Sequence, residues 1–168
     1  MIKKLEIQKG VTIVELLVYM GLLSIFIVVI LDVLLTVLDA RLQAESTSSV
    51  DQDTNFILAK LSSDIYNADS VTYPVNAGDS GNSLTLIKNG IAYSYSEDAS
   101  GNFIVTTGSS SANLNSTNTI LTGLSFKRTQ TADPDTKPVI KINYSLKSVI
   151  EVHGKVDSRD IETAVGLR

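Results

Sequence analysis

Glu15 is the residue whose chemistry conflicts most with its surroundings. It is the one charged residue in the apolar run from Val11 to Leu31, VTIVELLVYMGLLSIFIVVIL. A carboxylate inside a membrane helix costs about 2.5–3.5 kcal/mol at the bilayer centre and less near an end, so it usually has a partner or a role. In the simpler interpretation, Glu15 only lies near the membrane surface, where the dipole of the helix N-terminus favours a negative charge.

A second interpretation gives Glu15 a cationic partner. If the chain is cut after Gly10, Val11 gains a free amine, which is largely cationic near neutral pH. Glu15 lies four residues further on, over the same face of a helix. The two charges can then neutralise each other, within one subunit or between neighbours. Before the cut, no such cation exists at Val11.

The elements around this junction predict a membrane anchor. The apolar run spans about 31 Å as a helix, close to the thickness of the hydrocarbon core of a bilayer. The basic residues Lys3, Lys4 and Lys9 precede it, which orients the N-terminus to the cytoplasm. An ordinary secretory signal would end in a small-residue cleavage site, and LDARLQA after the run matches one poorly.

The junction KGVTIVELL resembles the class III leader of type IV prepilins. The residues that carry the resemblance are Gly10, Thr12, Glu15, Leu16 and Leu17. The resemblance implies that a membrane aspartyl peptidase cuts after Gly10 on the cytoplasmic face and N-methylates the new terminus at Val11. It also implies that Glu15 recruits each subunit to the terminus of its neighbour during assembly. The first mature residue is usually Phe in this family and is Val here, a departure that bears on methylation more than on processing.

The resemblance extends to the type of subunit and to its partners. Major pilins commonly carry a proline about twenty residues into the mature helix, where this chain has Asp32, and many carry a disulfide or a calcium loop. This chain has no cysteine, and its segment 51–74 resembles J-type minor pseudopilins and minor pilins. We therefore expect a minor pilin or pseudopilin of a type IV pilus or a type II secretion-like filament. Its partners would be other pilin or pseudopilin subunits, the prepilin peptidase, the assembly platform and the cytoplasmic membrane.

The expected fold class is α+β and pilin-like: a long N-terminal helix packed on a mainly antiparallel β-sheet head. We expect a leader at 1–10, a transmembrane and filament-core helix at 11–38, and an extracytoplasmic head at 39–168. One helix should run from about Val11 to about Ala68, with local loosening at Ser46–Ser49. The face expected to pack on the sheet comprises Thr54, Ile57, Leu58, Leu61, Ile65 and Ala68, which recur at helical spacing.

The rest of the chain predicts strands. An Asn-Gly pair at Asn89 favours a tight hairpin turn, and the segment 108–119, GSSSANLNSTNT, reads as a polar loop. In the last long strand, Ile140, Ile142, Tyr144 and Leu146 alternate onto one face. The expected strands are 84–87, 91–96, 103–107, 120–128 and 139–152, with an edge strand at 161–168.

Other residues that could do chemistry have simpler interpretations. His153 lies near Asp157 and Asp160, but a lone histidine between a strand and a turn predicts an exposed side chain rather than a catalytic triad. Oxygen ligands for calcium could come from Asp133 and Asp135 or from Asp79 and Asn82, although acids beside a proline more often make a turn. Asn115 and Asn143 match the glycosylation acceptor pattern, which also occurs by chance. The tyrosines of 91–96 predict cross-strand packing, with a binding surface as the alternative.

Two classes of function follow. The first is a structural filament subunit, and the second is a membrane-anchored recognition, adhesion or DNA-capture module whose helix is only a tether. The net charge of −4 argues against a dominant nucleic-acid surface. A third class, an extracytoplasmic hydrolase, lacks a plausible residue set, so we predict no enzyme activity, catalytic residue, metal or cofactor. Gly10 and Glu15 favour the first class, because a tether requires neither.

Overall fold

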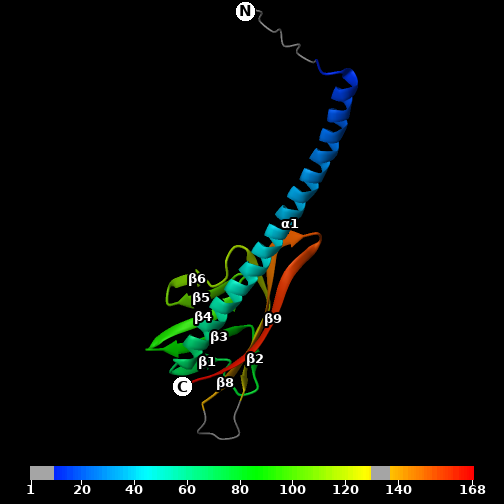
Figure 1. Ribbon diagram of the computed structural model, residues 1–168. Coiled ribbons are helices and arrows are strands. Elements are labelled where there is room, and N and C mark those ends of the chain that lie inside the picture. The colour runs from blue at the N-terminus through cyan, green and yellow to red at the C-terminus, as the bar shows by residue number, and fades with distance from the viewer. Residues whose placement is uncertain (1–9, 130–136) are drawn as a thin grey trace, which may run out of the picture. The chain divides into compact units, whose positions relative to one another are not determined.

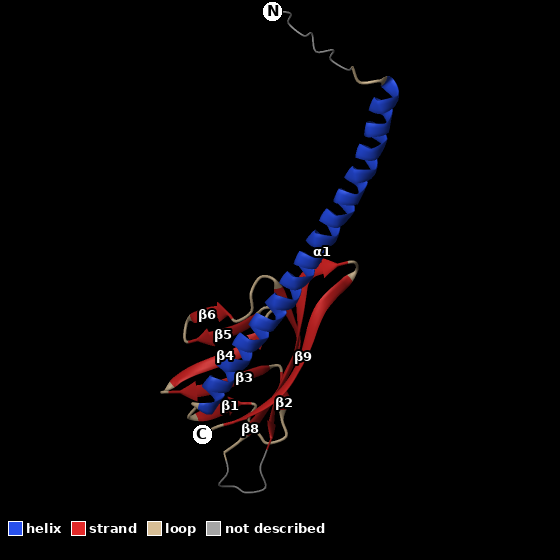
Figure 2. Ribbon diagram, in the orientation of Figure 1, coloured by secondary structure: helices blue, strands red, loops and turns tan. Residues whose placement is uncertain are grey.

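The computed structural model describes residues 10–129 and 137–168 and shows an α+β chain, as expected. A single long helix, α1, runs from Ile13 to Tyr66, and strands follow it (Figures 1 and 2). Every strand pairing is antiparallel. The chain divides into two compact units, Met1–Arg41 and Leu42–Arg168, which are described separately below.

In the first unit, α1 is apolar on all sides. Every large apolar side chain from Val11 to Leu38 is exposed, none by less than 45%. By its length and composition, this helix is long and apolar enough to span a membrane. A helix that is hydrophobic all round needs an apolar environment on every side.

In the second unit, α1 supplies one side of the core. The predicted packing face is confirmed: Ile57, Leu61 and Ile65 are completely buried, and Leu58 packs partly buried against the same cluster. The loosening expected at Ser46–Ser49 does not occur. The Ser49 hydroxyl donates a hydrogen bond to the Glu45 carbonyl one turn back. Ser46 is buried, and its hydroxyl donates a hydrogen bond to the Ile150 carbonyl of β8.

The strands form two sheets where the sequence predicted one. The first sheet has the order β1-β3-β4-β5-β6, and the second has the order β2-β7-β8-β9. The expected hairpin is confirmed between β3 and β4, where Asn89 and Gly90 both adopt positive φ angles, 53° and 74°. The strands are β1 Ser70–Tyr73, β2 Ser80–Gly81, β3 Ser83–Lys88, β4 Ile91–Glu97, β5 Phe103–Thr107, β6 Ser110–Asn113, β7 Thr119–Thr129, β8 Val139–Val152 and β9 Lys155–Gly166.

The second sheet buries the predicted face of β8. Ile140, Ile142, Tyr144 and Leu146 are all buried, and Tyr144 contacts the Phe103 ring of β5 at a centroid distance of 6.3 Å. The closing strand lies at the edge of this sheet, as predicted, but it begins earlier than expected, at Lys155. Strand β9 runs alongside the second half of α1 within this unit (Figure 1), and Asp51 of α1 forms an ion pair with Arg159 of β9 at 2.7 Å.

The segment 108–119 differs from the prediction of a polar loop, because part of it forms a strand and part of it is buried. It contains β6, and Leu114, Asn115 and Thr119 are buried. A carboxylate on α1 holds the segment: Asp53 Oδ2 accepts hydrogen bonds from the backbone N–H of Ser116, the Ser116 hydroxyl and the Thr119 hydroxyl. These polar groups can pack against the core because Asp53, which is far away in the sequence, accepts their hydrogen bonds.

Candidate functional site

The start of α1 is fixed by a side-chain cap. The Thr12 hydroxyl accepts a hydrogen bond from the Glu15 N–H at 3.2 Å, and the Thr12 carbonyl accepts the first helical bond, from the Leu16 N–H, at 3.1 Å. Thr12 is therefore the N-cap, and Thr-Ile-Val-Glu has the spacing of a capping box. This cap places Gly10 and Val11 just outside the helix and Glu15 in its first turn.

No described contact requires a glycine at position 10. It is exposed, its φ lies outside the region that favours glycine, and a Cβ built on it would meet no atom within 4 Å. A larger side chain would therefore fit here without displacing any described residue. If glycine is needed at this position, the requirement comes from another molecule.

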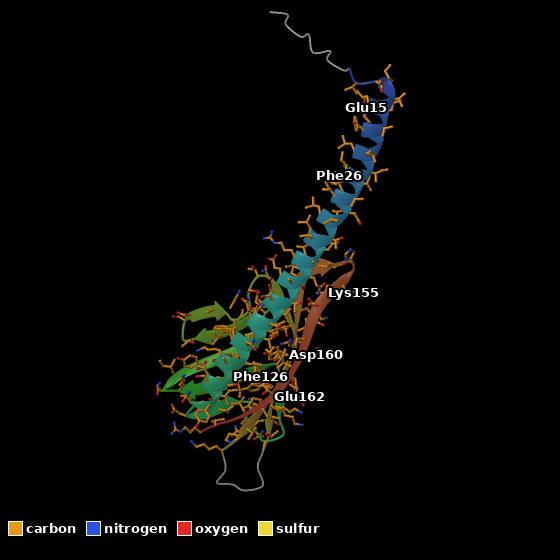
Figure 3. The ribbon with its side chains drawn as sticks, viewed as in Figure 1. Glu15, Phe26, Phe126, Lys155, Asp160 and Glu162 are labelled. Atoms are coloured by element: carbon orange, nitrogen blue, oxygen red, sulfur yellow. The ribbon has the colours of Figure 1, made fainter. Side chains whose placement is uncertain are left out.

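Glu15 lies on the exposed surface of α1 and has one side-chain partner among the described residues. The Tyr19 hydroxyl donates to Glu15 Oε1 at 2.9 Å from one turn further along the helix. Sequence reasoning missed this contact, although the four-residue spacing of an acid and a tyrosine could have suggested it. Figure 3 shows Glu15 near the start of α1, well before Phe26. The leader residues Lys3, Lys4 and Lys9 lie outside the described residues.

Comparison with family models, curated proteins and solved structures finds no match to this chain. After Glu15, the next charged residue in the chain is Asp32. The junction thus consists of an accessible glycine, a capped helix start and a single carboxylate in front of an exposed apolar surface.

The structure places His153 at the surface and engages one of its neighbouring acids elsewhere. This residue is exposed in the turn between β8 and β9, with φ 51°, as predicted for a histidine between a strand and a turn. The nearby Asp157 is already engaged, because its Oδ2 atom accepts hydrogen bonds from Gln43 and Thr47 on α1. Asp157 therefore fastens β9 to the helix within the second unit.

Two of the remaining candidates, Asp79 and Asn115, have structural explanations. Asp79 accepts two hydrogen bonds from Asn76, from its backbone N–H and its side-chain amide, and so closes a turn. Asp133 and Asp135 lie outside the described residues, and the described part of the chain contains no cluster of three potential metal ligands. Asn115 is buried, accepts from the Phe103 N–H and donates to the Thr119 carbonyl, so its amide replaces missing strand pairing.

A buried charged cluster around Asp64 was not predicted. Asp64 is 1% exposed and pairs with Lys60 and with Lys88, at 2.8 Å each, while the Tyr95 hydroxyl donates to it. Tyr95 is completely buried, which corrects the alternative of a tyrosine binding surface at this position. The cluster joins the end of α1 to the β3–β4 hairpin.

Hydrogen bonding decides the charge state of this cluster. Burial tends to raise the pKa of Asp64, but hydrogen bonds from Lys60, Lys88 and Tyr95 outweigh burial and hold this pKa below its ordinary value. Burial and the neighbouring carboxylate raise the pKa of Tyr95. The acid is therefore ionised and the phenol neutral around neutral pH, so the cluster serves as a structural tie rather than a proton relay.

We predict that Asp64→Asn removes a pH-dependent part of the stability of the second unit. Because the folded pKa of Asp64 lies below its ordinary value of 3.8, its stabilisation is fully present above that pH and is lost as pH falls through the folded pKa. At pH 7 the variant should be less stable by about 1–3 kcal/mol, since two lysines lose their shared acceptor. Urea unfolding of residues 42–168 at pH values from 7 to 2 measures this.

Tyr95→Phe is the matched control. It removes a hydrogen bond but keeps the carboxylate charge and both lysine partners, so most of the acid dependence should remain. A stability gap between Asp64→Asn and the unchanged chain that stays constant down to pH 2 would contradict the ionised tie.

Proposed function

We propose that this chain is a structural filament subunit of the type IV pilin class, a pilin or pseudopilin. It is inserted in the cytoplasmic membrane with its N-terminus inside, cut after Gly10, and assembled through the first half of α1. The observation that carries this proposal is the junction itself. A glycine that no described contact requires lies just before a capped apolar helix whose first turn carries a carboxylate.

The exposed apolar surface of α1 supports its burial first in a membrane and then in a bundle of helices. From Val11 to Leu38 the large apolar side chains are exposed on all sides of the helix. Such a surface is stable in the hydrocarbon core of a membrane. A bundle of neighbouring helices offers the same apolar surroundings, so transfer from membrane to filament keeps these side chains out of water.

Electrostatic attraction would favour the transfer of the helix from the membrane to the filament. In lipid, the Glu15 carboxylate is poorly solvated, and its Tyr19 partner supplies a hydrogen bond but no opposite charge. Cleavage after Gly10 creates a cation at Val11 on every subunit. Docking against a neighbour can then bring the carboxylate of one subunit to the amine of another in a low-dielectric bundle, where their attraction is much stronger than in water.

Processing gives the first test of this function. Gly10→Leu should leave the precursor uncut in the membrane, because the peptidase loses the residue it reads while the chain keeps its own fold. Gly21→Leu is the matched control, since a Cβ at Gly21 also meets no atom within 4 Å and this position lies beyond the junction. Immunoblotting of membranes distinguishes precursor from mature chain. Normal cleavage of the Gly10→Leu chain would contradict the proposed processing.

Assembly gives the second test. Glu15→Gln should leave processing and membrane insertion intact while reducing incorporation into filaments at least ten-fold. Gln at this position keeps the backbone N–H that Thr12 caps and an oxygen that can accept from Tyr19, so the substitution removes the charge with little change in shape. The measurement is the amount of variant in sheared, purified filaments relative to the amount of mature chain in the membrane.

Tyr19→Phe is the control for this second test. It removes the hydrogen bond to Glu15 but leaves the carboxylate charge, and it should assemble nearly normally. A plain membrane tether predicts no effect from either substitution. Normal amounts of the Glu15→Gln chain in purified filaments would therefore argue for the tether and against the subunit.

A further inference from the structure

We propose that the first half of α1 docks against a second copy of this chain through an ion pair between Asp32 of one copy and Arg41 of the next. The two copies would be parallel and staggered along the helix axis by nine residues, about 13.5 Å. This inference rests on the proposed function, because it requires that α1 be buried against other helices. It identifies the partner as the same chain, which requires a repeating subunit in place of the minor subunit expected from segment 51–74, and it adds a contact separate from Glu15.

Asp32 is a charge placed in an otherwise apolar, exposed surface. It lies between Leu31 and Val33, which are 52% and 58% exposed. Its backbone carbonyl accepts a bond from the Thr36 hydroxyl. Within residues 10–129 and 137–168, the Asp32 carboxylate has no hydrogen-bond or ion-pair partner, and neither has the Arg41 guanidinium.

Helical geometry prevents these two charges from pairing within one chain. Nine residues correspond to two and a half turns, so Asp32 and Arg41 point to opposite sides of α1. Asp39, two turns from Asp32, lies on the Asp32 side and already makes an interaction of its own. The helix therefore has an acidic side and a basic side at neighbouring levels.

A head-to-tail contact between identical copies requires the two pairing residues to lie on opposite sides of the helix, as Asp32 and Arg41 do. When two copies stand parallel, the side that one presents is opposite to the side that the other presents. The Asp32 side of one copy then faces the Arg41 side of the next, and the next copy still offers its own Asp32. A contact of this heterologous kind repeats without closing and builds an open filament.

Burial makes the pair necessary rather than optional. Covering the exposed Leu34, Leu35 and Leu38 between the two charges also removes water from Asp32 and Arg41. A charge buried without a partner is strongly unfavourable, whereas a complete pair is close to neutral. From Val11 to Arg41 the chain has one cationic side chain, Arg41, and Lys60 and Lys88 are already paired with Asp64.

The absence of native cysteine allows a direct cross-linking test. The full chain carrying Asp32→Cys together with Arg41→Cys is assembled into filaments and treated with a short bis-maleimide, since an ion pair holds backbones further apart than a disulfide reaches. Because the contact continues from copy to copy, the linker should give a ladder of dimers, trimers and higher multimers. Each single-cysteine chain is the matched control and should give no ladder.

A charge-neutralising cycle tests the energetics independently. Asp32→Asn and Arg41→Gln should each reduce incorporation into filaments about ten-fold, because each leaves one buried charge without its partner. The chain with both substitutions should recover most of the loss, since no unpaired charge remains. The amount of mature chain in the membrane should be the same for all three variants.

The outcomes separate this inference from the proposed function. Filaments that contain the double-cysteine chain but give no ladder, or that link it only to a different protein, would overturn the self-contact and leave the filament subunit standing. A double-neutralised chain that assembles no better than the worse single variant would do the same. A chain that never enters filaments would overturn both.

Discussion

The physical constraint behind this protein is that the first half of α1 cannot be stable in water. Its apolar side chains are exposed on every side from Val11 to Leu38, and two carboxylates, Glu15 and Asp32, interrupt that surface. Lipid satisfies the apolar groups better than it satisfies the charges. An array of identical or similar helices that supplies cations at matching positions would satisfy both. Under the proposed function, the pairing of these charges would make membrane insertion a step toward assembly.

The second half of the same helix meets a different constraint. From Leu42 to Tyr66 it has one buried face, and three of its acids have partners within the second unit. Asp53 holds the segment after β6, Asp51 pairs with Arg159 of β9, and Asp64 ties the helix end to the β3–β4 hairpin. These acids sit on α1, whereas their partners come from both sheets. One helix thus organises the core of this unit, and its acidic side chains fix the strands around it.

Periodicity and turn chemistry predicted much of this fold. Ile57, Leu61 and Ile65 recur at helical spacing, Ile140 to Leu146 alternate, and Asn89-Gly90 is a strong turn signal, so each element could be placed. The division into two sheets and the ordered segment 108–119 could not be predicted, because both depend on contacts between distant residues such as Asp53 with Ser116. At the junction, the sequence indicated Gly10 and Glu15. The spacing of Glu15 and Tyr19 could also have suggested their hydrogen bond, whereas the free space around Gly10 could be seen only in the structure.

The proposed function requires the assembled chain to begin with a cation at Val11, and the mass of the assembled protein shows whether it does. The intact mass of the protein recovered from sheared filaments should correspond to residues 11–168, with or without one added methyl group. That result would place a free amine four residues before Glu15 in every subunit. A mass that retains residues 1–10, or a chain that begins near Ala44, would contradict the account, because Glu15 would then have no terminal cation to meet.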